Sequence, residues 1–228
     1  AYCMARDGDA HAAAALLERA GVDSPAVVLD RARLLLHADM AEEAVAVLEP
    51  LMVDTQKVEV AAVARLLGAR ALNDNGASTN AMQVLAGLRA EGANLPPDFA
   101  ALAMASEAFL RSQGAIADAQ AVTLAESAVK TAESLLVKLE CDMTFARISS
   151  KYGLANRASE STRRLISAVP RSDIVAQTVR DVADNLLAAG MYEEALAENT
   201  LFISSFSGNP LEAAVLRGRG KALMGLGR

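Results

Sequence analysis

The chain has 228 residues, of which 53% are apolar and only 4% aromatic, and it carries a formal net charge of −6. This acidic balance argues against a general nucleic-acid binder, which needs clustered positive charge. No apolar run approaches the roughly 18 residues that a membrane helix needs, so we expect no direct membrane insertion.

The predicted elements repeat along the chain. Tight-turn residues recur every 31 to 39 positions, and an alanine follows five positions after each of the first six. Repeats of this length are typical of stacked supersecondary units. We therefore interpret residues 1–228 as a single repeat domain. The turn residues are Gly8, Asp39, Gly76, Gly114, Gly153, Gly190 and Gly227, and the alanines are Ala13, Ala44, Ala81, Ala119, Ala158 and Ala195.

Each repeat contains two amphipathic helices. A small residue stands seven positions before most turns and a large apolar residue four positions before them, as in Ala183 and Leu186. Residues three apart share one face of a helix. After the turn, apolar residues follow the alanine at three and seven positions, as in Val47 and Leu51 after Ala44. The pattern predicts an all-α chain of antiparallel helix hairpins with small residues at the helix contacts.

Prolines and glycines mark the boundaries of these hairpins. Most prolines fall between one hairpin and the next, where a helix begins or ends. Pro50 instead falls inside a predicted second helix, which it should end or bend around Leu48. No glycine or proline lies between Gly114 and Gly153, so we place the break there in the polar stretch 130–134.

These columns resemble the tetratricopeptide repeat (TPR). The resemblance is carried by Ala-Ala-Gly-Met-Tyr-Glu-Glu-Ala-Leu at 188–196, by Gly-Lys-Ala-Leu-Met-Gly-Leu-Gly at 220–227 and by Met-Ala-Glu-Glu-Ala-Val at 40–45. The chain departs from the family at Glu107, which fills a small-residue column, and at Asp39, which replaces the turn glycine. Most spacings also exceed the usual ~34 residues. Sel1-type and pentatricopeptide repeats share the same hairpin plan.

The resemblance implies a right-handed superhelical solenoid of about six repeats and about twelve helices. In this family the first helix of each hairpin lines a concave groove that binds a protein or peptide. The repeat pattern also indicates a fragment of a longer chain. The last helix, about 211–226, would then leave Leu223 and Leu226 without a following helix, so we expect weak self-association through this C-terminal edge.

Residues suited to catalysis or metal binding are sparse. His11 and His37 stand far apart, without Cys or Asp at ligand spacing. The stretch 218–221 resembles a phosphate loop but lacks its first glycine and the Ser/Thr after the lysine. We therefore expect no enzymatic activity, no metal site and no cofactor. We interpret Cys3 and Cys141 as small buried hydrophobes, which fits a cytosolic setting and equally a periplasmic protein without disulfides.

One pattern points to a binding surface. Positions ten, six and three before each turn form a stripe on the first helix of each hairpin, beside the core columns. The positions on or beside this stripe hold eight basic residues and only three acidic ones, Asp74, Glu140 and Asp184. They form either ordinary ion pairs with neighbouring helices, each of small energy, or a groove that selects acidic segments or a terminal carboxylate. The candidate groove residues are Arg33, Arg70, Arg111, Arg147, Lys151, Arg180, Arg217 and Lys221.

Two functions fit this organisation. The first is a non-enzymatic scaffold or adaptor that holds a peptide or protein segment, acidic in character, in its groove. The alternative is the sensing or assembly arm of a larger regulatory or envelope-export protein.

Overall fold

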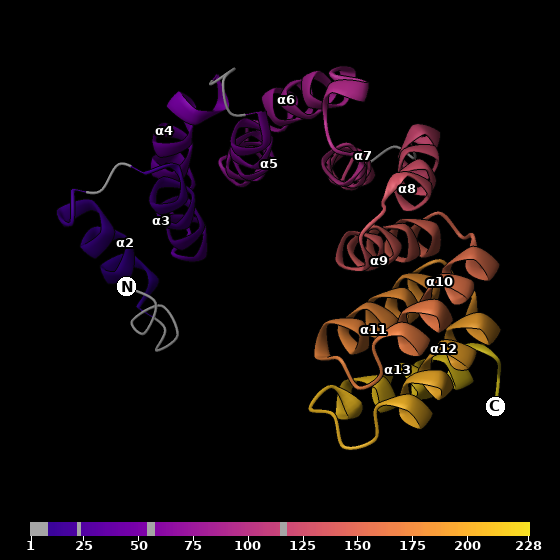
Figure 1. Cartoon of the computed structure of the whole chain (residues 1–228). Coiled ribbons are helices and arrows are strands. Elements are labelled where there is room, and N and C mark those ends of the chain that lie inside the picture. The colour runs from indigo at the N-terminus through magenta and orange to yellow at the C-terminus, as the bar shows by residue number, and fades with distance from the viewer. Residues whose placement is uncertain (1–8, 22–23, 54–57, 115–117) are drawn as a thin grey trace. The chain divides into compact units, whose positions relative to one another are not determined.

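The computed structural model describes residues 9–21, 24–53, 58–114 and 118–228. In these ranges it contains twelve α-helices, one short 3₁₀ helix, η1 (Gly92–Asn94), and no strand, which confirms the all-α prediction. The α-helices, labelled in Figure 1, are α2 (Ala10–Arg19), α3 (Pro25–His37), α4 (Ala41–Met52), α5 (Val58–Asp74), α6 (Ser78–Ala90), α7 (Pro97–Ser112), α8 (Ala119–Thr131), α9 (Leu135–Lys151), α10 (Ala155–Ala168), α11 (Asp173–Ala188), α12 (Tyr192–Ser205) and α13 (Glu212–Gly225).

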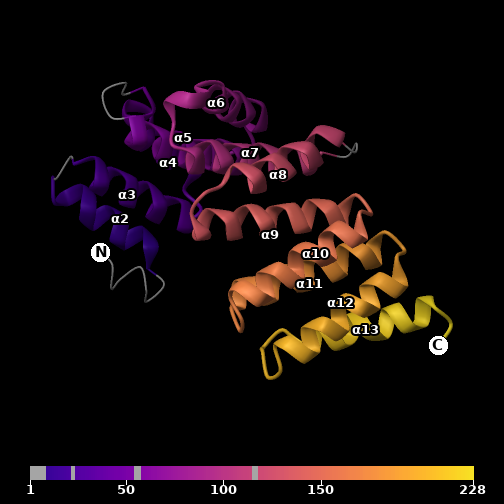
Figure 2. The same cartoon turned by 45° about the vertical axis from the view of Figure 1, so that its right-hand side comes forward.

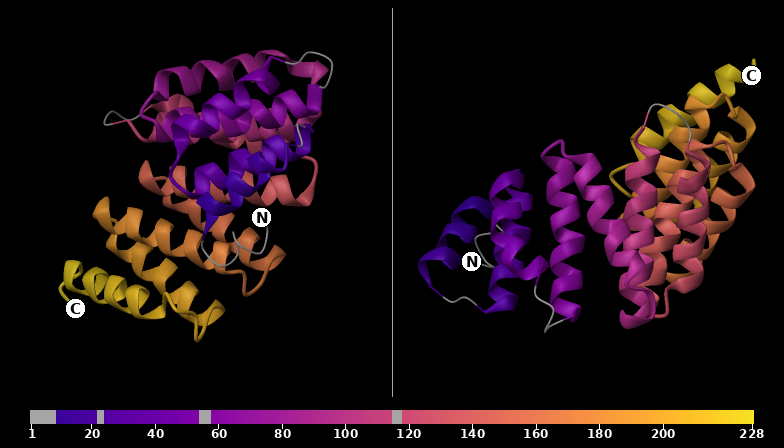
Figure 3. Two further views of the ribbon diagram at one scale, coloured as in Figure 1. Left: turned by 90° about the vertical axis from the view of Figure 1, so that its left-hand side faces the viewer. Right: turned by 90° about the horizontal axis from the view of Figure 1, so that it is seen from above.

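The helices group into two compact units, Ala1–Leu110 and Arg111–Arg228. In each unit the helices stack in chain order as hairpins, the arrangement of a helical solenoid. In the first unit α3 contacts both α4 and α5, and α5 contacts α6 (Figure 3, right panel). In the second unit α9 contacts α11, which in turn contacts α13 (Figure 2). That residues 1–228 form a single repeat domain stays a prediction.

The small-residue columns lie at helix contacts, as predicted. Seven positions before the turns, Ala32, Ala69, Ala146 and Ala183 are at most 1% exposed. The alanines five positions after the turns are fully buried in five hairpins, at Ala13, Ala44, Ala81, Ala158 and Ala195. Because alanine has a single methyl group, it lets two helix backbones approach closely at these positions.

The prediction is wrong at Ala119, which is exposed. In the other hairpins the second helix begins so that the alanine is its fourth residue, as Ala195 is in α12. Here α8 begins at Ala119 itself, after the capping residue Asp118. Its buried alanines are therefore Ala121, Ala125 and Ala128. Relative to its turn residue, α8 begins three residues later than the other second helices. The alanine five positions after the turn therefore lies in the exposed first turn and not in the core.

Gly190 shows how the hairpins close. It has a φ of 74°, in the left-handed region that glycine enters without a Cβ penalty. Its N–H donates to the Leu187 carbonyl at 3.0 Å, and the Met191 N–H donates to the Leu186 carbonyl at 2.9 Å. This pair of hydrogen bonds is the Schellman motif, which ends α11. Asp39 has a similar φ of 58°, which aspartate tolerates better than most residues, so it can replace the turn glycine.

Two predicted breaks have different outcomes. The break expected at 130–134 is confirmed, because α8 ends at Thr131 and α9 begins at Leu135. The helix that contains Pro50 does not end at Leu48, since α4 continues to Met52. Pro50 lacks a single N–H donor, and only two residues of α4 follow it, so the helix keeps most of its internal hydrogen bonds. The free Met52 carbonyl accepts a hydrogen bond from Arg65 Nε at 2.8 Å, which satisfies the helix end.

Candidate partner-binding surface

Side chains of α9 and α11 fix these two helices against each other. Arg147 Nε donates to Asp181 Oδ2 at 3.0 Å, and Gln177 Nε2 donates to the other carboxylate oxygen at 2.6 Å. Asn185 Nδ2 donates to the Arg147 carbonyl at 3.2 Å and to Ser150 Oγ at 3.0 Å. Charge-assisted and amide hydrogen bonds together therefore set the register between the first helices of two successive hairpins.

Arg180 extends this network along α11. Its Nε lies 3.3 Å from Asp184 Oδ2, one helical turn further on. The side chains of Arg147 and Arg180 are each 31% exposed, so both guanidinium groups face solvent at one edge. A partly exposed ion pair contributes little to stability. These arginines can therefore exchange part of their pairing for contacts with a partner.

The basic residues of α13 differ from those of α9 and α11. Arg217 and Lys221 are exposed, and no carboxylate of the described residues lies within 4.0 Å of either charge. They stand four residues apart and so share one side of the helix. We call the exposed side of α9, α11 and α13 that carries Arg147, Arg180, Arg217 and Lys221 the arginine face.

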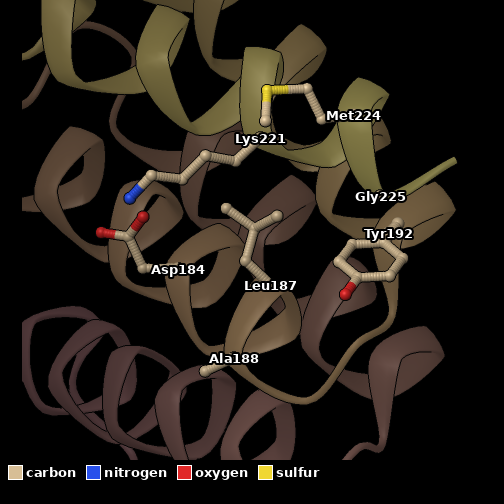
Figure 4. A pocket seen from close by; sticks show the side chains of 7 residues that line it. All are labelled: Asp184, Leu187, Ala188, Tyr192, Lys221, Met224 and Gly225. Carbon is tan, nitrogen blue, oxygen red and sulfur yellow. The ribbon is translucent and has the colours of Figure 1, made fainter. Parts of the chain in front are cut away.

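A pocket of about 720 Å³ opens on the arginine face between α11 and α13. Leu187 and Ala188 of α11, Met224 and Gly225 of α13 and the ring of Tyr192 supply its apolar lining (Figure 4). Asp184 and Lys221 line its polar side, where the lysine side chain extends toward the carboxylate (Figure 4). The sequence stripe contains Asp184, Leu187, Lys221 and Met224, whereas Tyr192 comes from the following helix.

Arg111 and Lys151 have structural contacts next to α8. Arg111 Nη1 donates to Asp118 Oδ2 at 3.0 Å. This bond, followed by the hydrogen bond from the Gln120 backbone N–H, holds the pKa of Asp118 below its ordinary value. Lys151 Nζ donates to the Ser112 carbonyl at the end of α7. Both side chains therefore hydrogen-bond to residues that precede α8 in the chain.

The two candidate groove residues of the first unit, Arg33 and Arg70, each form an ion pair within their own helix. Arg33 Nη1 lies 2.8 Å from Asp30 Oδ1, three residues earlier on α3. Arg70 Nε lies 3.7 Å from Asp74 Oδ2, four residues later on α5. Both arginine side chains are more than half exposed, so these pairs contribute little to stability.

Sequence reasoning missed three carboxylates, Asp30, Asp118 and Asp181, each of which pairs with a candidate basic residue. The positive excess expected from the sequence is therefore reduced at Arg33, Arg111 and Arg147. Asp30 could have been found from its spacing of three residues on one helix. Asp181 lies 34 residues from Arg147 in the chain, and only the stacking of hairpins brings the two together.

Other potential sites are sparse in the described part of the chain. No group of three or more His, Cys, Asp or Glu side chains gathers there as metal ligands would. The described helices include none with both the length and the apolar character needed to cross a bilayer. Cys141 is fully buried, as expected, and Cys3 lies outside the described residues.

Comparison with known proteins rests on the fold. No protein-family model matches the chain, and no curated protein matches its sequence. Among solved structures, a thermophilic TPR protein of Thermus thermophilus matches with a TM-score of 0.57 and 15% sequence identity. The match covers 88% of this chain and 100% of the other. The chain has the TPR fold. The resemblance drawn from the residues at 188–196 and 220–227 is thereby confirmed at the level of fold.

Proposed function

We propose that this chain is a non-enzymatic scaffold that binds a protein or peptide segment with acidic side chains on the arginine face. The observation that carries the proposal is the exposure of Arg217 and Lys221, neither of which has a carboxylate of the described residues within 4.0 Å, beside the partly exposed Arg147 and Arg180. Arginine forks and lysine ammonium groups suit carboxylates, and partly exposed cations bind them at small desolvation cost.

The fold supports this proposal in a second way. First helices of successive hairpins lie side by side in the second unit, so their exposed sides form one continuous surface across α9, α11 and α13. A surface of this kind can contact an extended segment along several helices at once. The same sequence columns occur in the first unit at Arg33 and Arg70, which we propose as partner contacts of that unit considered by itself.

The test is to reverse Arg147 and Arg180 to Glu and to measure partner binding alongside folding. The tagged full chain is incubated with an extract of its source cells, cross-linked and purified, and the retained proteins are quantified. We expect the double variant to lose them, and wild-type retention to fall as salt rises, because charges farther apart than about 8–10 Å are screened at physiological ionic strength.

A matched double variant controls for net charge. Lys138 on α9 and Arg163 on α10 are exposed, and reversing both to Glu changes the formal charge by the same amount away from the arginine face. Circular dichroism melts of both variants report folding. Equal retention by a folded Arg147→Glu/Arg180→Glu chain and by wild type would contradict the proposal and leave these arginines as structural ion pairs.

A further inference from the structure

The pocket between α11 and α13 has apolar walls that its own side chains leave open. Met224 is 76% exposed although it lines the pocket. Leu187 is partly buried, and the Tyr192 ring stands at the side formed by Gly225 (Figure 4). An apolar ligand group can cover this exposed apolar surface. Its binding is then favoured by about 25 cal/mol per Å² of apolar area removed from water.

The charge on the polar side of the pocket is unbalanced. Asp184 already pairs with Arg180, at 3.3 Å between Oδ2 and Nε. Lys221 has no carboxylate of the described residues within 4.0 Å, and neither has Arg217, one turn earlier on α13. Asp184 is thus paired with Arg180, whereas Lys221 has no described carboxylate within 4.0 Å and can pair with one supplied by a ligand. The pocket therefore combines apolar walls with a cation at its edge.

We propose that this pocket anchors the partner segment by taking one apolar side chain whose neighbouring residue is Asp or Glu. The apolar side chain lies against Leu187, Tyr192 and Met224, and the carboxylate pairs with Lys221. This inference rests on the proposed function and narrows it, because it assigns both the binding position and the local chemistry of the partner. Acidity alone would not select this pocket over the rest of the arginine face.

Three short fluorescein-labelled peptides test the proposal by fluorescence anisotropy at physiological salt. The first is Gly-Ser-Glu-Asp-Leu-Glu-Asp-Gly-Ser. In the second, Gly replaces Leu, and in the third, Gln and Asn replace the acidic residues. We expect the full chain to bind the first peptide about tenfold more tightly than either control, which corresponds to about 1.4 kcal/mol for the leucine side chain and about the same for the four carboxylates together.

Variants of the chain locate the binding. Lys221→Glu should weaken the first peptide about tenfold or more. Met224→Ala should also weaken the first peptide, while leaving the weak binding of the second peptide, which lacks leucine, unchanged. Arg219→Glu is the matched control, because Arg219 lies on the same helix, is exposed and does not line the pocket. This reversal should change affinity by less than about twofold, since exposed charges on the far side are largely screened.

Three outcomes overturn the pocket proposal: no peptide binds, the Gly peptide binds as well as the Leu peptide, or Arg219→Glu weakens binding as much as Lys221→Glu. The extract experiment keeps the two proposals apart. If Arg147→Glu/Arg180→Glu abolishes partner retention while Lys221→Glu leaves it intact, the scaffold function stands and the anchor pocket fails. If wild type and the double variant retain the same proteins, the scaffold proposal itself fails.

Discussion

Gly225 at the end of α13 lies directly against the ring of Tyr192 at the start of α12. A Cβ built on Gly225 would stand 2.6 Å from two ring carbons, closer than real Cβ contacts come. The absence of a side chain at residue 225 therefore lets an aromatic ring pack on a helix backbone. This contact forms one wall of the pocket on the arginine face (Figure 4).

Gly225→Ala should therefore destabilise the chain and move the Tyr192 ring. We expect a loss of about 1–3 kcal/mol in the free energy of unfolding, because an inserted methyl group forces neighbouring atoms to shift. Gly220→Ala on the same helix is the control, since a Cβ there meets nothing within 4 Å. It should stabilise by roughly 0.5–1 kcal/mol. Urea unfolding measures both, and equal effects would contradict the contact.

Ala183→Leu should overpack the contact of α11 with its neighbours. Ala183 is 1% exposed on α11, whose Val182 and Leu186 belong to a core cluster with Ala195. We expect a loss of about 1–3 kcal/mol in unfolding free energy. Ala119→Leu provides the control, because Ala119 is exposed on the first turn of α8 and should change stability by less than about 0.5 kcal/mol. A tolerated leucine at residue 183 would show that the crossing has spare volume.

Asp118→Asn tests the charge pairing with Arg111. That pairing, with the Gln120 N–H, lowers the pKa of Asp118 below 3.8. Because the folded pKa is depressed, the carboxylate stabilises the fold above the unfolded-state pKa, and this stabilisation is lost as pH falls through the folded pKa. Asparagine keeps an oxygen that can cap Gln120 but loses the charge.

We therefore expect Asp118→Asn to be less stable than wild type at neutral pH, by a difference that shrinks as pH falls below 3.8. Chemical denaturation at a series of pH values measures this difference. A gap that stays constant into the acid range would assign the effect to helix-cap geometry and not to charge.

The C-terminal edge should support weak self-association. Leu216 is 48% and Met224 76% exposed on α13, and Leu223 and Leu226 are partly buried. So few apolar side chains give a dissociation constant of roughly 1 mM, equivalent to about −4 kcal/mol. Leu216→Glu should remove the concentration dependence seen in sedimentation velocity. Leu136→Glu, at a leucine on α9 that is 79% exposed, should not. A wild-type chain that stays monomeric at millimolar concentration would contradict this.

The stripe on the first helices predicts part of the pocket lining. The sequence named Lys221 and Asp184, which both line the pocket. Leu187 and Met224, also in the lining, stand three positions further along the same stripe, on the same helix face. The stripe did not identify Tyr192 or Gly225, which lie 33 residues apart in the chain and meet only where α12 passes α13. Contacts between helices follow from packing, which a single periodic pattern does not specify.

The sequence by itself determined the all-α class, the hairpin repeat and the turns at Asp39, Gly76, Gly153 and Gly190. These features depend on neighbours within a few positions, on the helical period and on the left-handed turn that glycine or aspartate permits. Tertiary structure decided the late start of α8 at Ala119, the Arg147–Asp181 pair and the position of Lys221 in the pocket lining. Each of these depends on where a second helix lies, because charge pairing and burial act over a few ångströms between segments that are distant in the chain.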